Sequence, residues 1–447
     1  MSRALPEEKA SSLGFALRAL RSRNYRLFFG GQLVSMTGTW MTSVATSWLV
    51  YRLTGSALQL GLVNFAGQIP AAILTPVAGI YVDRWNKHKL LLWTQGLSML
   101  QSLSLAFLTF TGRISVAWLI WLNVAEGLIN AFDMPCRQSF LIEMIDKKED
   151  LGNAIALNSS LVNAARLLGP SIGGVVIAAV GEGWCFFADG VSFLAVLGAL
   201  LRMVIKPSAS ERRQHPPVME SLKEGWRYAS GFAPIRSIML LLALVCLVGV
   251  PYTVLIPVFA GQILHGGPHT LGLLMTCSGC GALVAAVWLA MRRSVRGLGG
   301  VIPTATAVFG AALVAFSFSR TVWLSCVLIV VAGAGFMIQL ASSNTIVQTI
   351  VEDDKRGRVM SFFMMAFLGS APFGSLFAGG FADRYGAPAT LRVGGVFCVL
   401  GALWFSRQLP EIRALVRPIY RKMGIIPEIA SGVNAAEELQ RPPEKNA

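Results

Sequence analysis

Apolar runs of about 20 residues recur along almost the whole chain, and they constrain its fold more than any other feature. A helix of about this length crosses the roughly 30 Å of hydrocarbon in a bilayer. Only 14% of the residues are charged, against roughly 25% in a soluble domain. A membrane-spanning barrel would instead show short segments of alternating polarity. The sequence therefore predicts an all-α protein that crosses a membrane many times.

Twelve such runs are present, and the longest polar stretch between them divides the chain into two sets of six. We therefore expect 12 transmembrane helices in two pseudo-symmetric six-helix bundles. Apolar residues at every fourth position of the polar stretch, beginning with Val218, predict a short amphipathic helix on the cytoplasmic face. The predicted parts are a cytoplasmic N-terminus at 1–26, a first bundle at 27–204, a cytoplasmic linker at 205–236, a second bundle at 237–407 and a cytoplasmic tail at 408–447. The predicted spans are 27–50, 58–82, 90–111, 115–136, 153–180, 184–204, 237–262, 270–290, 299–318, 322–343, 360–381 and 387–406.

The basic residues predict the orientation of these spans. Of the 38 lysines and arginines, 32 fall in segments on the same side as both termini and five on the opposite side, while Arg166 lies inside a span. Because cytoplasmic loops carry the excess of Lys and Arg, we expect both termini in the cytoplasm and the chain in the inner (cytoplasmic) membrane. The basic residues are spread over seven short segments, so the net charge of +15 indicates topology and not nucleic-acid binding.

A charged corner separates the second and third spans, in the stretch GIYVDRWNKHKL at 79–90. A short cytoplasmic turn has to be polar, which explains the charges but not the spacing of Gly79 and Asp83. That spacing resembles the loop signature Gly-x-x-x-Asp-Arg-x-Gly-Arg-Lys of the major facilitator superfamily, and the resemblance extends over about residues 15–408. Asn86 stands where the signature has its second Gly, and Asn tolerates a left-handed turn better than most residues.

The resemblance implies two bundles around a central path and a cytoplasmic gate at this corner. Gly79 would let a neighbouring helix approach closely. Asp83, followed by Arg84, would cap a helix or pair with a cation across the gate. A second copy of the pattern, at Gly379 and Asp383, follows the eleventh span and falls on the opposite side, where it could contribute to an outer gate.

The fifth span carries a second signature. Gly169-Pro170-Ser171-Ile172-Gly173-Gly174 matches the Gly-Pro-x-x-Gly-Gly core found in exporters of that superfamily. Proline bends a helix and glycines allow close packing, so a kinked, closely packed membrane helix without an export role is the alternative. Stretches at 19–63, 133–145 and 151–174 are further similar to the bacterial group that includes the enterobactin exporter and macrolide-efflux permeases.

Charged residues also fall inside the predicted spans, where each costs roughly 2.5–3.5 kcal/mol without a partner. Glu126 and Arg166 lie near the middle of the fourth and fifth spans, which we expect to run antiparallel across a short loop. We therefore expect the two side chains to meet. The hypothesis is that Glu126 exchanges protons and that Arg166 keeps it ionised until the cavity changes. A structural ion pair that never titrates is the alternative.

Polar residues on the spans around the central path make up the predicted substrate cavity. Asn130 and Asp133 follow Glu126 on one helix face. Asp133 lies nearer the cytoplasm with Arg137 one turn later, and we interpret this pair as part of the gate, with substrate contact as the alternative. The predicted cavity residues are Gln32, Thr39, Ser43, Gln68, Asn123, Asn130, Asn158, Asn163, Tyr252 and Gln339.

These features predict a proton-coupled exporter that moves amphipathic small molecules, such as drugs or siderophores, by alternating access. A lysophospholipid or other lipid translocator on the same fold, or a transport-inactive membrane sensor, remains an alternative. The sequence has no Gly-x-x-x-x-Gly-Lys-[Ser/Thr] loop for a nucleotide and no Ser/His/Asp or metal-binding constellation. We therefore expect no enzyme activity, cofactor or metal, and we expect the chain to act as a monomer.

Overall fold

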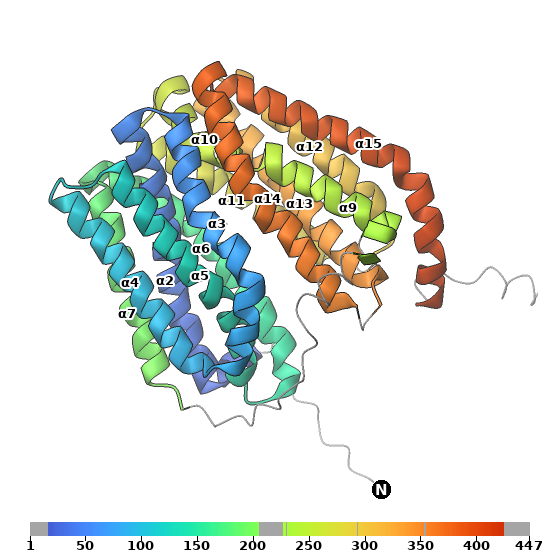
Figure 1. The fold of residues 1–447 in the computed structure, drawn as a ribbon, viewed down its shortest axis with the longest axis horizontal. Coiled ribbons are helices and arrows are strands. Elements are labelled where there is room, and N and C mark those ends of the chain that lie inside the picture. The colour runs from blue at the N-terminus through green and yellow to red at the C-terminus, as the bar shows by residue number, and fades with distance from the viewer. Residues whose placement is uncertain (1–16, 205–226, 229, 293, 353–354, 424–447) are drawn as a thin grey trace, which may run out of the picture.

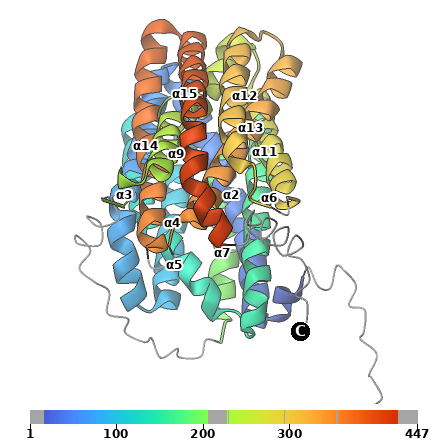
Figure 2. The ribbon, with the colours of Figure 1, turned by 90° about the vertical axis from the view of Figure 1, so that its right-hand side faces the viewer.

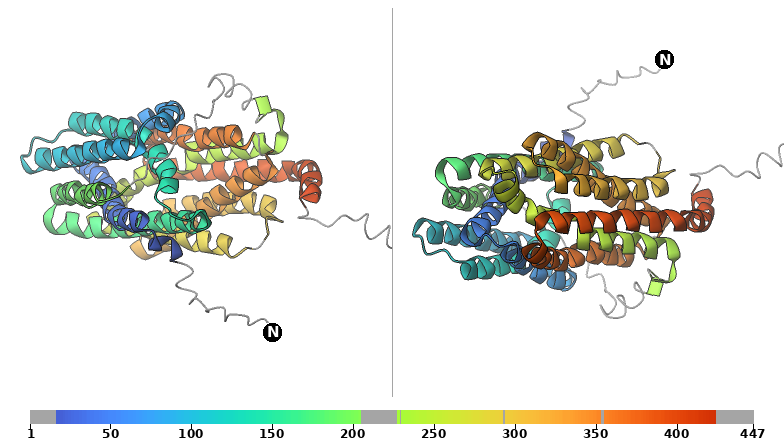
Figure 3. Two further views of the ribbon diagram at one scale, coloured as in Figure 1. Left: turned by 90° about the horizontal axis from the view of Figure 1, so that it is seen from below. Right: turned by 90° about the horizontal axis from the view of Figure 1, so that it is seen from above.

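The computed structural model describes residues 17–204, 227–228, 230–292, 294–352 and 355–423, and the regular structure within them is entirely helical. The predicted amphipathic linker helix lies outside the described residues. Figure 1 shows two bundles, an N-terminal half in blue to green and a C-terminal half in yellow-green to red. Seen from below and from above, the two halves lie side by side (Figure 3).

Each predicted span coincides with a helix or, for the seventh span, with a run of shorter helical segments. The N-terminal half holds η1 (Arg18–Arg21), α2 (Arg23–Thr54), α3 (Ala57–Arg84), α4 (Lys87–Phe110), α5 (Val116–Glu143), η2 (Lys148–Asp150), α6 (Leu151–Val180) and α7 (Glu182–Leu201). The C-terminal half holds α9 (Ala233–Leu244), η3 (Val245–Gly249), α10 (Tyr252–Val258), η4 (Phe259–Ile263), α11 (Pro268–Ala290), α12 (Leu298–Phe318), α13 (Val322–Ile350), α14 (Arg356–Tyr385) and α15 (Ala387–Lys422). Within the described residues, 10 helical stretches are long and apolar enough to cross a membrane. Helices α2 and α5 are not among them, because they carry many polar side chains.

Several of these helices begin directly after a capping residue with a short polar side chain. Ser56 and Ser115 cap α3 and α5 by accepting a hydrogen bond from a backbone N–H of the first turn. Asn86 does the same for α4, with the Lys89 amide 3.0 Å away. The φ of Asn86 is −68°, so Asn replaces Gly in the loop motif as a helix cap, and our expectation of a left-handed turn at this residue was wrong.

Prolines break or bend helices of the C-terminal half. Pro251 and Pro257 lack the N–H of a regular helical residue, and the π-helical turns η3 and η4 adjoin α10, the short helix between them. Helix α15 extends to Lys422, well past the predicted span end at 406. It contains Pro410 and Pro418, and Figure 1 shows it turning near its C-terminal end. Figure 2 shows α15 beside α9 and α12, its packing partners.

Helices that follow one another in the sequence are often not neighbours in the bundle. Helix α2 packs mainly against α6 and α7, α3 against α5 and α14, and α4 against α5 and α7. Helices α5 and α6 barely touch, although only a short loop with η2 joins them. Residues at similar depth on α5 and α6 therefore face different partners.

The two ends of the molecule differ in how the halves pack. We call the end at which α2 begins and α3 ends the basic end, because the basic segments gather there, and the opposite end the far end. In Figure 1 the halves meet at the far end and spread apart towards the basic end. One apolar core at the far end is shared by both halves and includes Val50, Leu60, Leu255 and Leu271. At the basic end each half has an apolar core of its own. The apolar packing that joins the halves is therefore at the far end.

Two glycine crossings bring the backbones of the halves together there. Gly61 of α3 faces Gly379 of α14, and a Cβ added to Gly379 would lie 2.6 Å from a carbonyl oxygen of α3. Gly174 of α6 faces Gly272 of α11, and a Cβ on Gly272 would lie 2.6 Å from a carbonyl oxygen of α6. Helices can approach this closely only where side chains are absent.

The second copy of the loop motif belongs to this far-end junction. Gly379 forms one of the two crossings. One turn later, Asp383 accepts a hydrogen bond of 2.9 Å from the Ser56 hydroxyl of the other half. Glycine and aspartate of this motif thus both contact the N-terminal half.

We expect Gly333→Ala to destabilise the protein by roughly 1–3 kcal/mol, as overpacked side chains do. Gly333 of α13 lies against the backbone of α11, and an added Cβ would overlap the Ser278 carbonyl oxygen. The measurement is thermal unfolding of the purified protein in detergent.

The matched control is Gly198→Ala in α7, where an added Cβ meets nothing within 4 Å. Its melting temperature should stay unchanged or rise, because Ala favours a helix over Gly by about 1 kcal/mol. Equal melting temperatures for both variants would contradict the close crossing.

Candidate functional site

A cavity of about 280 Å³ opens within the N-terminal half. Helices α2, α3, α4, α5 and α7 supply nearly all of its lining, and Val254 of α10 is the contribution from the C-terminal half. Val50, Leu60 and Val254 also belong to the apolar core shared by the halves, so apolar packing bounds the cavity at the far end. The remaining lining is largely hydroxyl, amide and carboxyl groups and contains no Lys, Arg or His.

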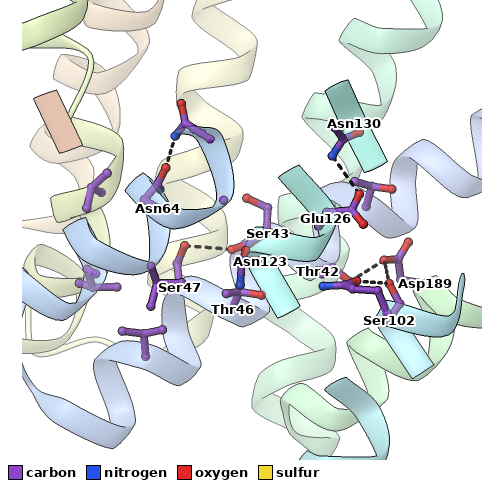
Figure 4. Close-up of a pocket in the computed structure, with 18 of the residues that line it drawn as sticks. Thr42, Ser43, Thr46, Ser47, Asn64, Ser102, Asn123, Glu126, Asn130 and Asp189 are labelled. Carbon is purple, nitrogen blue, oxygen red and sulfur yellow. Dashed lines mark hydrogen bonds between the residues drawn. The ribbon is translucent and has the colours of Figure 1, made fainter. Parts of the chain in front are cut away.

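Glu126 projects into this cavity from α5 (Figure 4). Its carboxylate accepts hydrogen bonds from the Ser98 hydroxyl, at 3.2 and 3.4 Å, and from the Asn130 amide nitrogen, at 2.9 Å. These partners are all neutral. Helix α4 provides Ser98, and Asn130 lies one turn along α5, so this carboxylate joins two helices, and no ion pair balances its charge among the residues that the structure describes.

Asp189 is a second carboxylate of the cavity and projects from α7. One carboxylate oxygen accepts hydrogen bonds from Thr42 of α2, at 2.9 Å, and Ser102 of α4, at 2.8 Å (Figure 4). The other oxygen has no hydrogen-bond partner, although the residue is only 2% exposed. Gly38 makes room for it, because a Cβ there would lie 2.7 Å from this oxygen. Asp189 is therefore buried, has no cationic partner in the described part of the chain, and has hydrogen bonds to only one of its oxygens.

Asp133 of α5 is buried nearer the basic end and differs from these two in having a cationic partner. It forms an ion pair with Arg137, and it accepts hydrogen bonds from Thr94 and Gln95 of α4, each at 2.8 Å. Arg137 in turn donates to the Gln32 side chain of α2 at 3.3 Å. These contacts tie α5 to α4 and α2 within one half, and none of them crosses to the other half.

The loop motif lies at the basic end, where the halves are apart. Our expectation that Gly79 lies against a neighbouring helix is not met in this structure, since an added Cβ would meet nothing within 4 Å. The physical reason is the separation of the two halves at this end. Arg84 is exposed, and the side chain of Asp83 lies outside the described part of the chain.

Glu126 and Arg166 do not meet, contrary to expectation. Within the described residues no ion pair joins them, and the Arg166 guanidinium lies over the ring of Trp40, 5.7 Å from its centroid. The prediction assumed that consecutive spans pack together. Helix α5 instead packs against α3 and α4, whereas α6 packs against α2, α7 and α11.

The glycines of the fifth span serve two different junctions. Gly169 and Gly173 of α6 lie against α2, where an added Cβ on Gly173 would be 3.3 Å from Met41. Gly174 lies against Gly272 of α11 in the other half. The motif therefore packs one helix simultaneously against its own half and against the opposite half, with Pro170 at the crossing.

Half of the predicted cavity residues line this cavity and half do not. Those that line it are Thr39, Ser43, Gln68, Asn123 and Asn130. Gln32 is buried beneath Arg137, Tyr252 donates to or accepts from Ser278 at 2.6 Å, and Gln339 is fully buried. Asn158 and Asn163 lie on α6, away from the lining.

Sequence reasoning missed the polar face of α4 altogether. Its buried residues are Thr94, Gln95, Ser98, Gln101 and Ser102. Their spacing of i, i+1, i+4, i+7 and i+8 places them on one helix face, which is a signal that the sequence does contain. The second missed set comprises Thr42, Thr46, Ser47 and Asn64, on α2 and α3.

The sequence model of the transmembrane secretion effector family, part of the major facilitator superfamily, matches residues 15–426. The chain belongs to this family. Relatives of this family member include the staphyloferrin A transporter of Staphylococcus aureus, 26% identical over 87% of this chain and 97% of that protein. The multidrug efflux pump Tap of Mycolicibacterium fortuitum is 25% identical over 86% of this chain and 95% of its own. The enterobactin exporter EntS of Citrobacter koseri is 24% identical over 88% of this chain and 94% of its own.

Solved structures support the fold of this secretion-effector family member. A bacterial homologue of the human lysosomal transporter Spinster, in an inward-facing and occupied conformation, superposes with a TM-score of 0.68 at 15% identity, over 88% of this chain and 98% of that one. The nucleoside transporter NupG gives a TM-score of 0.65 at 14% identity, over 87% and 98%. The family and these relatives are transporters and not enzymes, and the chain is a multi-pass membrane protein.

We expect Arg137→Gln to destabilise this transporter by roughly 3–5 kcal/mol, because it leaves the Asp133 carboxylate buried without its cation. The side chain of Asp133 is 3% exposed. The double variant Asp133→Asn/Arg137→Gln should recover most of the loss, since no charge is then left unpaired. Thermal unfolding in detergent measures both.

The matched control is Lys355→Gln, which removes a cation from the more exposed pair with Glu352. It should cost no more than about 1 kcal/mol. If Asp133→Asn/Arg137→Gln is as unstable as Arg137→Gln alone, the loss of stability does not come from an unpaired buried charge.

Proposed function

We propose that this protein is a proton-coupled exporter of amphipathic small molecules that works by alternating access. The observation that carries the proposal is the Glu126 carboxylate, held in a cavity by neutral partners only. Burying a carboxylate without a cation costs free energy, and binding a proton or a cationic cargo removes that cost. A site that both ligands neutralise is one at which they compete, and competition couples the two fluxes in opposite directions.

The orientation follows from the basic residues. In the proposal all 12 helical segments cross the inner membrane with the basic end in the cytoplasm, which the location of 32 of the 38 lysines and arginines supports. The polar helices α2 and α5 can cross because their polar faces meet the cavity and not the lipid.

The packing of the halves supports alternating access. The shared apolar core and the two glycine crossings hold the far end closed, while the separate cores at the basic end leave Gly79 without a neighbour. We infer that this is an inward-facing state and that Gly79 and the neighbouring Asp83 and Arg84 meet the other half when the basic end closes. The far-end contacts would then open.

The charge of the cavity bears on the cargo. Relatives carry siderophores or drugs according to their names. The lining of this cavity holds Glu126 and Asp189 and no basic residue, which favours a neutral or cationic cargo over a polyanion. Arg166, which lies over Trp40, has no direct pairing with Glu126 in this proposal.

The exchange cycle uses groups of this chain alone. With the basic end open, the ionised Glu126 binds an amphipathic cation from the cytoplasm. After the halves rock, a proton from the far side neutralises Glu126 and displaces the cargo. One proton crossing 100 mV supplies about 2.3 kcal/mol, enough for a roughly fifty-fold gradient.

We expect Glu126→Gln to abolish proton-driven accumulation of ethidium, a fluorescent lipophilic cation, in everted membrane vesicles. The neutral amide keeps much of the shape of the side chain but cannot take up a proton. Glu411→Gln, which neutralises an exposed acid of α15, is the matched control and should transport normally. Undiminished accumulation by Glu126→Gln would refute the assigned role.

We also expect a cross-link between the halves at the far end to stop transport. Ser56→Cys and Asp383→Cys, placed in a background without the seven native cysteines, would form a bridge where the hydroxyl and carboxylate now lie 2.9 Å apart. Transport should fall on oxidation and return on reduction, while either single variant is insensitive. Full transport in the oxidised double variant would exclude opening at this end.

A further inference from the structure

The polar face of α4 crosses the N-terminal half from the basic end towards the far end. Its five polar residues, from Thr94 to Ser102, are each no more than 7% exposed. Eight residues of helix correspond to about 12 Å along the axis. A stripe of this kind inside a bundle needs hydrogen-bond partners, since an unpaired buried polar group costs free energy.

Three carboxylates accept hydrogen bonds from this polar face, each at a different position along the axis of α4. Asp133 accepts from Thr94 and Gln95, Glu126 accepts from Ser98, and Asp189 accepts from Ser102. The order along α4 is therefore Asp133 nearest the basic end, Glu126 in the middle and Asp189 nearest the far end.

The three carboxylates differ in charge compensation. Asp133 has Arg137 as a cationic partner. Glu126 and Asp189 have none among the described residues, and both line the same cavity. One oxygen of Asp189 also lacks any hydrogen-bond partner at 2% residue exposure. An uncompensated acid with a free oxygen is a group that gains from binding a proton.

The surroundings of Asp189 contain few other groups that titrate. Helix α2 presents Thr42 to it and α4 presents Ser102. The Cys185 thiol lies one turn away on α7 itself and bonds to a backbone oxygen of α6. Glu126 faces Asp189 across the cavity. No ion pair links Asp189 to a Lys, Arg or His in the part of the chain that the structure describes.

Polar groups extend from Asp189 towards Glu126. Ser102 lies within hydrogen-bond distance of both Asp189, at 2.8 Å, and the Gln101 side-chain oxygen, at 3.3 Å. The Gln101 amide nitrogen donates to the Leu122 carbonyl of α5, one turn before Glu126, at 3.3 Å. The cavity between the two acids has room for several waters at about 30 Å³ each.

We propose that Asp189 is a second proton-binding carboxylate, which receives protons from the far side and passes them along the polar face of α4 to Glu126. This inference rests on the proposed function. In the transfer, Asp189 loses its carboxyl proton to the hydroxyls and waters of the path and becomes a carboxylate, and Glu126 gains one proton and becomes neutral. Asp133, which is paired with Arg137, ends the path towards the basic end.

Infrared spectroscopy of the protein in lipid tests the site without any cargo. The carbonyl band of a protonated carboxyl group is followed while the pH is raised. We expect Asp189→Asn and Glu126→Gln each to remove a separate component of the titrating band. In each variant the remaining component should titrate at lower pH, because one negative neighbour has been removed. Asp146→Asn, which changes an exposed acid of the loop after α5, is the matched control and should leave the band unchanged.

Transport in everted vesicles tests the relay. We expect Asp189→Asn to lose ethidium accumulation driven by a pH gradient but to keep the exchange of labelled for unlabelled ethidium without a gradient. Asp189→Glu should restore some accumulation. Substitution of Na⁺ by a large organic cation should change neither activity if the ion is a proton.

The outcomes separate this inference from the function on which it rests. An Asp189→Asn spectrum identical to that of the unchanged protein overturns the relay, as does an equal loss of accumulation and exchange, which would leave Asp189 only holding helices together. A requirement for Na⁺ also overturns it in favour of a metal cation. If Glu126→Gln removes no band and ethidium is not transported by the unchanged protein, the proposed function fails instead.

Discussion

Burial of negative charge among apolar helices is the constraint on which the N-terminal half depends. Asp133 and Asp189 are buried, Glu126 is partly buried in the cavity, and each accepts at least one hydrogen bond from the same face of α4. Only Asp133 also has a cation. The same stripe of polar residues thus holds α5 and α7 against α4, and it leaves two acids that no cation pairs with among the described residues. A ligand that brings positive charge is what such a cavity lacks.

Glycine residues determine where the N-terminal and C-terminal halves can make close contact. Where the halves touch, at Gly61 with Gly379 and at Gly174 with Gly272, the backbones approach too closely for any side chain. These crossings lie beside the one apolar core that spans both halves. Among the described residues each half has its own apolar core at the basic end, and the halves lie apart there. Closure at one end and separation at the other arise from where small and apolar residues are placed along α3, α6, α11 and α14.

Much of the fold could be predicted because it depends on local patterns. The length of each apolar run predicted a helix, whereas the cap at Asn86 was not predicted and starts α4 at Lys87, before the predicted start at 90. The helix ends were less predictable: α15 continues to Lys422, past Pro410 and Pro418. The pairing of Glu126 with Arg166 could not be predicted correctly, since it required knowing that α5 and α6 are not neighbours. The place of Asp189 in the site could not be predicted either, because its partners Thr42 and Ser102 are distant in sequence.

The sequence by itself determined that the chain is a multi-pass helical membrane protein, which faces of its helices are polar, and which residues are small enough for close contact. Composition and periodicity suffice for this, because each helix satisfies its own backbone hydrogen bonds in the membrane. The tertiary structure decided which faces meet. It placed Arg166 against Trp40 and Asp189 beside Glu126 in one cavity, because helix order in a bundle depends on packing between distant segments and not on succession along the chain.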